Sequence, residues 1–224
     1  MSGKIILDLC GGTGAWSKPY RDAGYDVRLI TLPDYDITET EFGSNGTIFF
    51  RSSDRQKEMN GINPENVYGI LAAPPCTMFS LARTRAKTPR DLREGMECVE
   101  ACLKVIWECQ KNYRKEYGYK TSLKFWALEN PWGLLRFFLG KPALIFQPYE
   151  FGDPYSKKTC LWGNFNEPKK SEVKKEVDIF HHGKMSDYKK YKLISGLVNN
   201  PKNRKELRSI TPQGFANAFF KANQ

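Results

Sequence analysis

The sequence has no apolar run of the roughly 18 residues that a membrane-spanning helix requires. Its first stretch, MSGKIILDLC, is too short in its apolar part and too soon acidic for a secretory signal. The six cysteines lack the paired spacing of zinc sites, and the two histidines, His181 and His182, are neighbours in a lysine-rich stretch. We therefore expect no membrane span, no metal site and no disulfide bond, as in a reduced intracellular protein.

Basic residues gather in two places along an otherwise neutral chain. The formal charge of +10 comes from residues 83–93, with five Lys or Arg against one Asp, and from residues 166–208, with twelve against six acidic residues. A solubilising surface would explain either segment alone. Two concentrated basic segments favour a docking surface for a polyanion, and nucleic acid in particular.

Apolar strands alternate with amphipathic stretches, and no internal repeat is present. Strands are predicted at residues 4–9, 25–30, 67–73 and 123–129, a helix from Asp91 to about Tyr117, and a hairpin from residues 144–151 and 158–163. The turn-rich residues 39–66 predict an inserted hairpin, and Thr211 with Pro212 predicts the start of a last helix. The pattern indicates an α/β fold, with a mostly parallel sheet covered by helices on both faces and active groups at the strands' carboxyl ends.

The glycine-rich turn CGGTGAW, residues 10–16, matches neither the G-x-G-x-x-G fingerprint nor a P-loop. With Asp8 it forms D-x-x-x-G-x-G, which resembles the first motif of S-adenosylmethionine (SAM)-dependent methyltransferases, a Rossmann-like family. The resemblance implies that the loop passes under the amino acid part of SAM. The second strand ends in Thr31-Leu32 where the family has a ribose-binding acid, and the next acids are Asp34 and Asp36.

Asp36-Ile37 resembles the Asp-Ile pair that flanks the adenine in that family, although it follows the second strand after very few residues. Trp16 has two interpretations, as a pocket wall or as core. The cofactor contacts that the resemblance implies are Asp8, Cys10, Gly11, Gly12, Thr13, Gly14, Trp16, Asp36, Ile37 and Pro74.

Cys76 follows two prolines at the end of an apolar run, LAAPPCTMFS, residues 71–80. The prolines end the strand and fix the angle at which the chain leaves the sheet, which would hold a nucleophilic thiol rigidly. Pro-Pro-Cys at this place resembles the cytosine-C5 methyltransferases, whereas amino-methylating relatives carry an aromatic residue instead of the Cys. The resemblance makes Cys76 the nucleophile.

Glu129 and Asn130 end the next apolar strand, in ALENPWG. They resemble the family's Glu-Asn-Val motif, with Pro131 in place of Val, and imply that Glu129 contacts N3 and the exocyclic amine of a flipped cytosine. A lone Glu at a strand end more often caps a helix or forms a salt bridge, but the order of the three motifs favours catalysis. The stretch FGDPYSKKTCLWG resembles a further motif, with Lys157 at its first Arg and a Thr at its second.

These motifs resemble a compact, phage-type DNA cytosine-C5 methyltransferase with SAM as cofactor. Residues 1–165 would form the SAM-binding and catalytic domain, residues 166–208 a small basic recognition segment, and residues 209–224 a helix that packs back on the catalytic domain. The partner would be double-stranded DNA, and the protein a monomer in the cytoplasm of a bacterial or phage-infected cell. The expected DNA contacts are Ser80, Arg83, Arg85, Lys87 and Lys158.

Two other functions stay open at this point. One is the same reaction on RNA, as in the tRNA-directed branch of the family, because basic charge does not separate the two substrates. The other is a SAM-fold protein that binds DNA without catalysis, since the second-strand acid and the second Arg are both missing.

Overall fold

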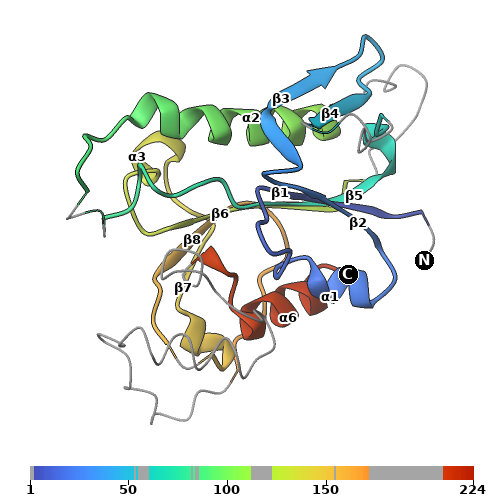
Figure 1. Cartoon of the computed structure of the whole chain (residues 1–224). Helices are drawn as coiled ribbons and strands as arrows, with labels where there is room; N and C mark the ends of the chain where they lie inside the picture. Colours follow the sequence, from blue (N-terminus) through green and yellow to red (C-terminus); the bar gives the residue numbers. More distant parts are fainter. Residues whose placement is uncertain are drawn as a thin grey trace.

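The computed structural model describes residues 3–52, 54, 61–81, 83, 86–111, 123–153, 155–171 and 209–224. Its centre is a six-stranded sheet with the order β2-β1-β5-β6-β8-β7 (Figure 1). β2, β1, β5 and β6 pair in parallel, and β8 is antiparallel to both of its neighbours. The strands are β1 (Ile5–Leu9), β2 (Asp26–Ile30), β5 (Val67–Ala72), β6 (Phe125–Pro131), β7 (Leu144–Phe146) and β8 (Thr159–Asn164).

Helices cover both faces of this sheet, as the sequence predicted (Figure 1). α2 (Leu92–Gln110) lies on one face, and α1 (Lys18–Asp22) and α6 (Gln213–Ala222) lie on the other. The strands are apolar on both sides, so Leu7 and Leu9 of β1 face the core under α2 while Ile6 faces the core around α6. Shorter helical turns are η2 (Pro64–Asn66), α3 (Arg136–Leu139) and η4 (Pro148–Phe151).

The predicted helix from Asp91 begins where expected. The Asp91 carboxylate accepts hydrogen bonds from the backbone N–H groups of Arg93 (2.9 Å) and Glu94 (3.0 Å), which is the geometry of an N-cap. The described helix ends at Gln110, and its predicted end near Tyr117 falls in residues 112–122, which lie outside the described part of the chain.

The inserted hairpin is also confirmed. β3 (Tyr35–Phe42) and β4 (Ile48–Ser52) pair antiparallel in a separate two-stranded sheet, and β3 contacts α2. Most of the predicted basic recognition segment, residues 172–208, lies outside the described residues.

The start of α6 differs from the prediction. The helix begins at Gln213 after Pro212, and no side chain at its N-cap makes a capping bond. The Gly214 N–H instead donates to the buried Asp153 carboxylate at 3.0 Å. A Cβ at Gly214 would lie 2.0 Å from the Phe151 carbonyl oxygen, so the helix start presses closely on η4. Thr211 as the cap was wrong because the cap comes from a residue far away in the sequence.

Candidate active site

Three predicted site segments leave the sheet at one edge. The register pairs Leu9 with Ala72 and Ala72 with Leu128, so the chain after β1, after β5 and near the end of β6 emerges side by side. This edge faces away from the labelled N terminus (Figure 1). β1 has β2 on one side and β5 on the other, so the strand order reverses there. Open α/β sheets bind ligands outside the carboxyl ends of their strands at such a reversal.

The loop after β1 needs its glycines. Gly12 and Gly14 have φ values of 57° and 68°, in the left-handed region that glycine adopts at little cost. Cys10, with φ at 57°, is the residue of this loop that adopts the region with a side chain. The Cys10 N–H donates to the Ile30 carbonyl at 2.7 Å, and the Gly12 N–H donates to Thr31 Oγ1 at 3.3 Å. Thr31, found where the family has an acid, therefore ties the loop to the end of β2.

Asp8 lies buried beneath this loop. Ser17 Oγ donates to its Oδ2 at 2.5 Å, while Oδ1 has no hydrogen-bond partner among the described residues. Burial raises the pKa of the Asp8 carboxyl to about 6, against the lowering effect of Ser17 and Arg21. A Cβ at Gly11 would lie 2.2 Å from Asp8 Oδ1, so only glycine fits above the carboxyl group.

The loop fits a cofactor that approaches the backbone closely. Gly12 and Thr13 are exposed, and no atom lies within 4 Å of the place where a Cβ of Gly12 would be. The backbone of Gly12 and Thr13 therefore forms an open surface at the reversal of the strand order, where the sequence predicted the amino acid part of SAM.

Asp36 lies in the neighbourhood of the loop. The pKa of the half-buried Cys98 thiol of α2 is raised to about 11, mainly by burial and also by the charges of the nearby Cys10 and Asp36. The Asp36 carboxylate accepts hydrogen bonds from the Thr38 N–H (2.9 Å) and Oγ1 (2.7 Å). Its contact with a cofactor stays a prediction.

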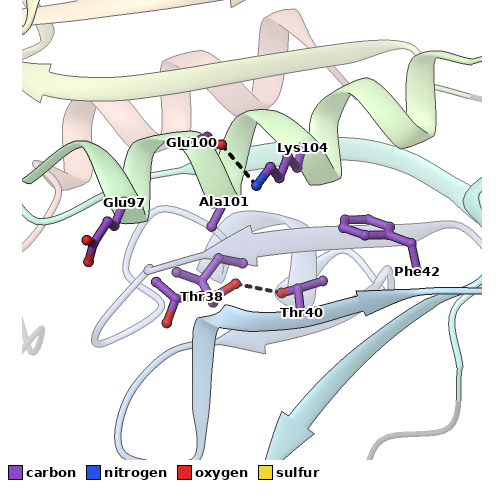
Figure 2. A pocket seen from close by; sticks show the side chains of 8 residues that line it. Thr38, Thr40, Phe42, Glu97, Glu100, Ala101 and Lys104 are labelled. Carbon is purple, nitrogen blue, oxygen red and sulfur yellow. Dashed lines mark hydrogen bonds and ion pairs between the residues drawn. The ribbon is translucent and has the colours of Figure 1, made fainter. Parts of the chain in front are cut away.

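A groove of about 230 Å³ lies between β3 and α2 (Figure 2). Its volume is below the about 300–1,000 Å³ typical of small-molecule sites. Lys104 and Glu100 form an ion pair of 2.9 Å at its wall. The residues that line it are Ile37, Thr38, Thr40, Phe42, Glu97, Glu100, Ala101 and Lys104.

Trp16 as a cofactor contact is corrected. Its side chain is 1% exposed, and its ring packs on Phe215 and Phe219 of α6 at centroid distances of 5.9 and 5.4 Å. The indole belongs to the core beneath the loop, so the second of its two interpretations holds.

Cys76 begins a tight turn at the end of β5. The Phe79 and Ser80 N–H groups donate to its carbonyl oxygen at 3.0 and 2.8 Å. Pro74 before it is buried, and Asn130 Nδ2 donates to the Pro74 carbonyl at 3.1 Å. The end of β6 is therefore bonded to the backbone that supports Cys76.

The Cys76 turn is held from two further sides. The Leu134 N–H donates to the Phe79 carbonyl at 2.9 Å, and a Cβ at Gly133 would lie 2.3 Å from that oxygen. Arg90 donates from Nη1 to the Met78 carbonyl (2.7 Å) and from Nη2 to the Ser80 carbonyl (2.8 Å). These contacts fix the turn between the start of α2 and the chain after β6.

Glu129 and Lys157 form an ion pair at this edge. Lys157 Nζ lies 3.4 Å from Glu129 Oε1, and the two side chains are only 13% and 14% exposed. Thr159 Oγ1 donates to the Lys157 carbonyl at 2.7 Å, which fixes the backbone of the lysine. The two motifs that contribute Glu129 and Lys157 therefore meet in space.

The predicted DNA contacts are found in different settings. Arg83 donates to the Pro89 carbonyl (2.9 Å) and to Thr88 Oγ1 (2.7 Å), within its own loop. Lys87 is exposed, and Ser80 forms an isolated bridge with Gly133. Lys158 Nζ lies 3.9 Å from the centre of the Trp132 ring. Arg85 lies outside the described residues.

Three residues that shape the site were not assigned these roles from the sequence. Asn130 was noted only as part of a motif, Arg90 only as one charge of a basic segment, and Ser17 not at all. The sequence signal for Asn130 was its place next to Glu129. Arg90 and Ser17 gave no signal, because their partners are backbone or buried groups that only the fold brings near.

Two further findings bear on the class of site. Among the described residues, no group of three or more His, Cys, Asp or Glu side chains is arranged to hold a metal ion, and no helix is long and apolar enough to cross a membrane. None of the six cysteines, all in the described part of the chain, forms a disulfide bond. Fold and site define an open, mostly parallel α/β protein with its candidate site at the carboxyl edge of the sheet.

No protein-family model and no curated protein matches this sequence. Among solved structures, the chain is similar to the Entamoeba histolytica methyltransferase EhMeth, with a TM-score of 0.36 and 12% identical residues. The similarity covers 78% of this chain, which spans 58% of the length of that protein. A similarity at this level supports no conclusion about activity, and the fold class rests on the sheet order itself.

Proposed function

We propose that this protein transfers a methyl group from SAM to C5 of cytosine in DNA. The observation that carries the proposal is the convergence of the glycine loop, Cys76 and Glu129 at the ends of three adjacent strands. The Asn130–Pro74 hydrogen bond and the Glu129–Lys157 ion pair support it, since both join the segments that the chemistry needs together. That the partner is double-stranded DNA and the protein a monomer stays a prediction.

The loop from Gly11 to Gly14 would hold SAM, with Asp36 and Ile37 as contacts to its adenosine. When bound, SAM supplies a methyl group on a positively charged sulfur, which makes that carbon electrophilic. Asp8 and Ser17 keep the loop in the shape that exposes the Gly12 and Thr13 backbone.

Cys76 would act as the nucleophile. Its thiolate adds to C6 of the cytosine, the π electron pair of the C5–C6 bond forms a C4–C5 double bond, and the C4–N3 π pair moves onto N3. With a proton taken up when the base binds, the Glu129 carboxylic acid donates to N3 and transfers that proton as the addition places negative charge there. The carboxylate that this leaves is stabilised by Lys157, whose Nζ lies 3.4 Å from Glu129 Oε1. At the end of the reaction C5 carries the methyl group, the C5 proton passes to solvent, its electron pair forms the C5–C6 double bond again and the Cys76 thiolate is expelled.

The target base has to leave the duplex to meet these groups. Flipping costs a few kcal/mol, which basic contacts to the DNA backbone offset. Lys87 and Lys158 would make such contacts. Arg83 would have to exchange its hydrogen bonds to Thr88 and Pro89 for bonds to a phosphate.

Covalent trapping by duplex DNA that contains 5-fluorocytosine tests the proposal. Fluorine cannot leave C5 as the proton does, so the Cys76 adduct persists and migrates as a complex on a denaturing gel. We expect trapping by the wild type in the presence of SAM, none by Cys76→Ser, and at least about a hundredfold slower trapping by Glu129→Ala. Cys98→Ser, another half-buried thiol, is the matched control and should trap normally.

Trapping by Cys76→Ser at the wild-type rate would contradict the proposal. A matched tRNA with 5-fluorocytosine separates the two substrates, since trapping on tRNA alone would transfer the same chemistry to RNA. Absence of trapping on both, with DNA binding intact, would identify a binding protein without catalysis.

A further inference from the structure

Two cations lie over one indole ring beside the candidate active site. The Arg136 guanidinium carbon is 4.3 Å from the centre of the Trp132 ring, and Lys158 Nζ is 3.9 Å from it. The backbone N–H of Trp132 donates to the Lys158 carbonyl at 2.8 Å, directly beyond the last paired residues of β6 and β8. Trp132 lies three positions after Glu129 in the sequence, so the ring and both cations are fixed close to the proposed catalytic carboxylate.

Arg136 and Lys158 have no carboxylate partner within the described residues, unlike the neighbouring Lys157. Lys157 is paired with Glu129, but within the described part of the chain no carboxylate forms an ion pair with Arg136 or Lys158. Arg136 Nη1 is buried and has no hydrogen-bond partner among the described residues. Two concentrated positive charges that no carboxylate pairs with are suited to an anionic oxygen such as that of a phosphate.

Exposed apolar side chains adjoin the two cations. Phe137 and Phe138 of α3 are 71% and 49% exposed, and the Phe137 ring lies 4.7 Å from the Arg136 guanidinium. Phe138 contacts Phe79 at a centroid distance of 6.2 Å, and Phe79 belongs to the Cys76 turn. Phe138 therefore packs the aromatic surface against the turn that carries the proposed nucleophile, through the buried Phe79.

We propose that Trp132, Arg136, Phe137 and Lys158 form a docking surface for the nucleic-acid strand that carries the target base. Arg136 and Lys158 contact its phosphates, and Phe137 stacks on an unpaired base beside the target. Cationic groups joined to exposed aromatic rings are the means by which proteins hold unpaired nucleotides. The location of the target base rests on the proposed function, whereas the charge and aromatic character of the surface do not.

Salt-dependent binding tests this surface. The probe is a labelled DNA duplex with a short unpaired stretch around one cytosine, and its affinity is measured by fluorescence anisotropy at several salt concentrations. Arg136→Gln and Lys158→Gln should each weaken binding regardless of sequence and lower the slope of log K against log salt by about one. Phe137→Ala should weaken binding about fivefold or more, with an unchanged slope.

Lys4→Gln is the matched control. Lys4 Nζ also lies over an aromatic ring, 4.3 Å from the centre of Tyr68, but at the opposite end of the strands. Its affinity and salt slope should equal those of the wild type. The docking surface would be wrong if Arg136→Gln and Lys158→Gln both kept the wild-type salt slope, or if they lost no more affinity than Lys4→Gln. Phe137 is exposed, so its variant tests the surface even if Arg136→Gln fails to fold.

The two proposals fail in different experiments. If the wild type traps 5-fluorocytosine while all three surface variants bind DNA normally, the docking surface is wrong and the proposed function stands. If the surface variants lose binding while the wild type traps neither DNA nor RNA, the surface stands and the proposed function is wrong.

Discussion

At the scale of single residues, Asp8 joins the glycine loop, residues 10–16, to the core. Its carboxyl group is inaccessible to water, bonded to Ser17 through one oxygen and covered by Gly11. A carboxyl group in that position is costly to ionise, because burial disfavours the charged form. The free energy of unfolding therefore depends on whether Asp8 holds a proton.

The pH dependence of stability should report this proton. The folded protein keeps it up to about pH 6, whereas an exposed Asp releases it near pH 3.8. The unfolded state binds fewer protons between these values, so the free energy of unfolding should fall as pH rises from about 4 to 6. The loss attributable to Asp8 is about 3 kcal/mol across that window, and no further loss is expected above it.

Urea unfolding between pH 4 and 7 measures this effect. Asp8→Asn should remove most of the fall, because the amide can accept the Ser17 bond without a charge. Asp22→Asn on the surface of α1 should leave the fall in place. An unchanged slope in Asp8→Asn would show that other groups are responsible.

At the scale of elements, the strand ends are joined by side chains rather than by the sheet alone. Asn130 links the end of β6 to Pro74, and Arg90 binds two carbonyls of the turn that follows. The Cys76 turn is thus held by the loop before α2 on one side and by the chain after β6 on the other. Such contacts determine how rigidly the proposed nucleophile is placed.

Loss of Arg90 should loosen that turn. We expect Arg90→Gln to slow covalent trapping about tenfold, through misplacement of Cys76, while SAM binding stays unchanged. Arg93→Gln removes the same charge three positions later and should trap at the wild-type rate. The rate constants of trapping at saturating DNA give the comparison, and equal losses in both variants would indicate a charge effect instead.

The strands and the edge of the sheet were predictable from the sequence because they depend on local patterns. Continuous apolar runs define β1 and β5, and the prolines after β5 mark its end. The cap of α6 and the role of Arg90 were not predictable, and the sequence left Trp16 open between a pocket wall and the core. Each depends on partners that only the folded chain brings near, such as Asp153 for the N–H of Gly214.

At the scale of the whole molecule, two cores lie on opposite faces of one sheet, and the proposed site lies where its strand order reverses. Cofactor binding at that reversal should stabilise the entire fold, since an unfolded chain has no such site. SAM at a hundred times its dissociation constant contributes about 2.7 kcal/mol, which corresponds to a rise in Tm of about 5–10 °C for a protein of this size.

A thermal unfolding series checks this expectation. SAM should raise Tm in the wild type and equally in Cys76→Ser, which removes chemistry and not the loop. NAD⁺ should have no effect, because the glycine spacing is not that of a dinucleotide site. A rise with NAD⁺ alone, or none with SAM, would contradict the cofactor assignment.

The packing of α6 beneath the glycine loop has a consequence for how this protein is made. The Tyr20 hydroxyl donates to the carbonyl of Asn223 across a separation of 203 residues, and Trp16 rests on Phe219. Contacts so distant in the sequence form late and slow the search for the native state. On the ribosome, the glycine loop is made before α6, so it stays without this support until α6 has emerged and packed beneath it.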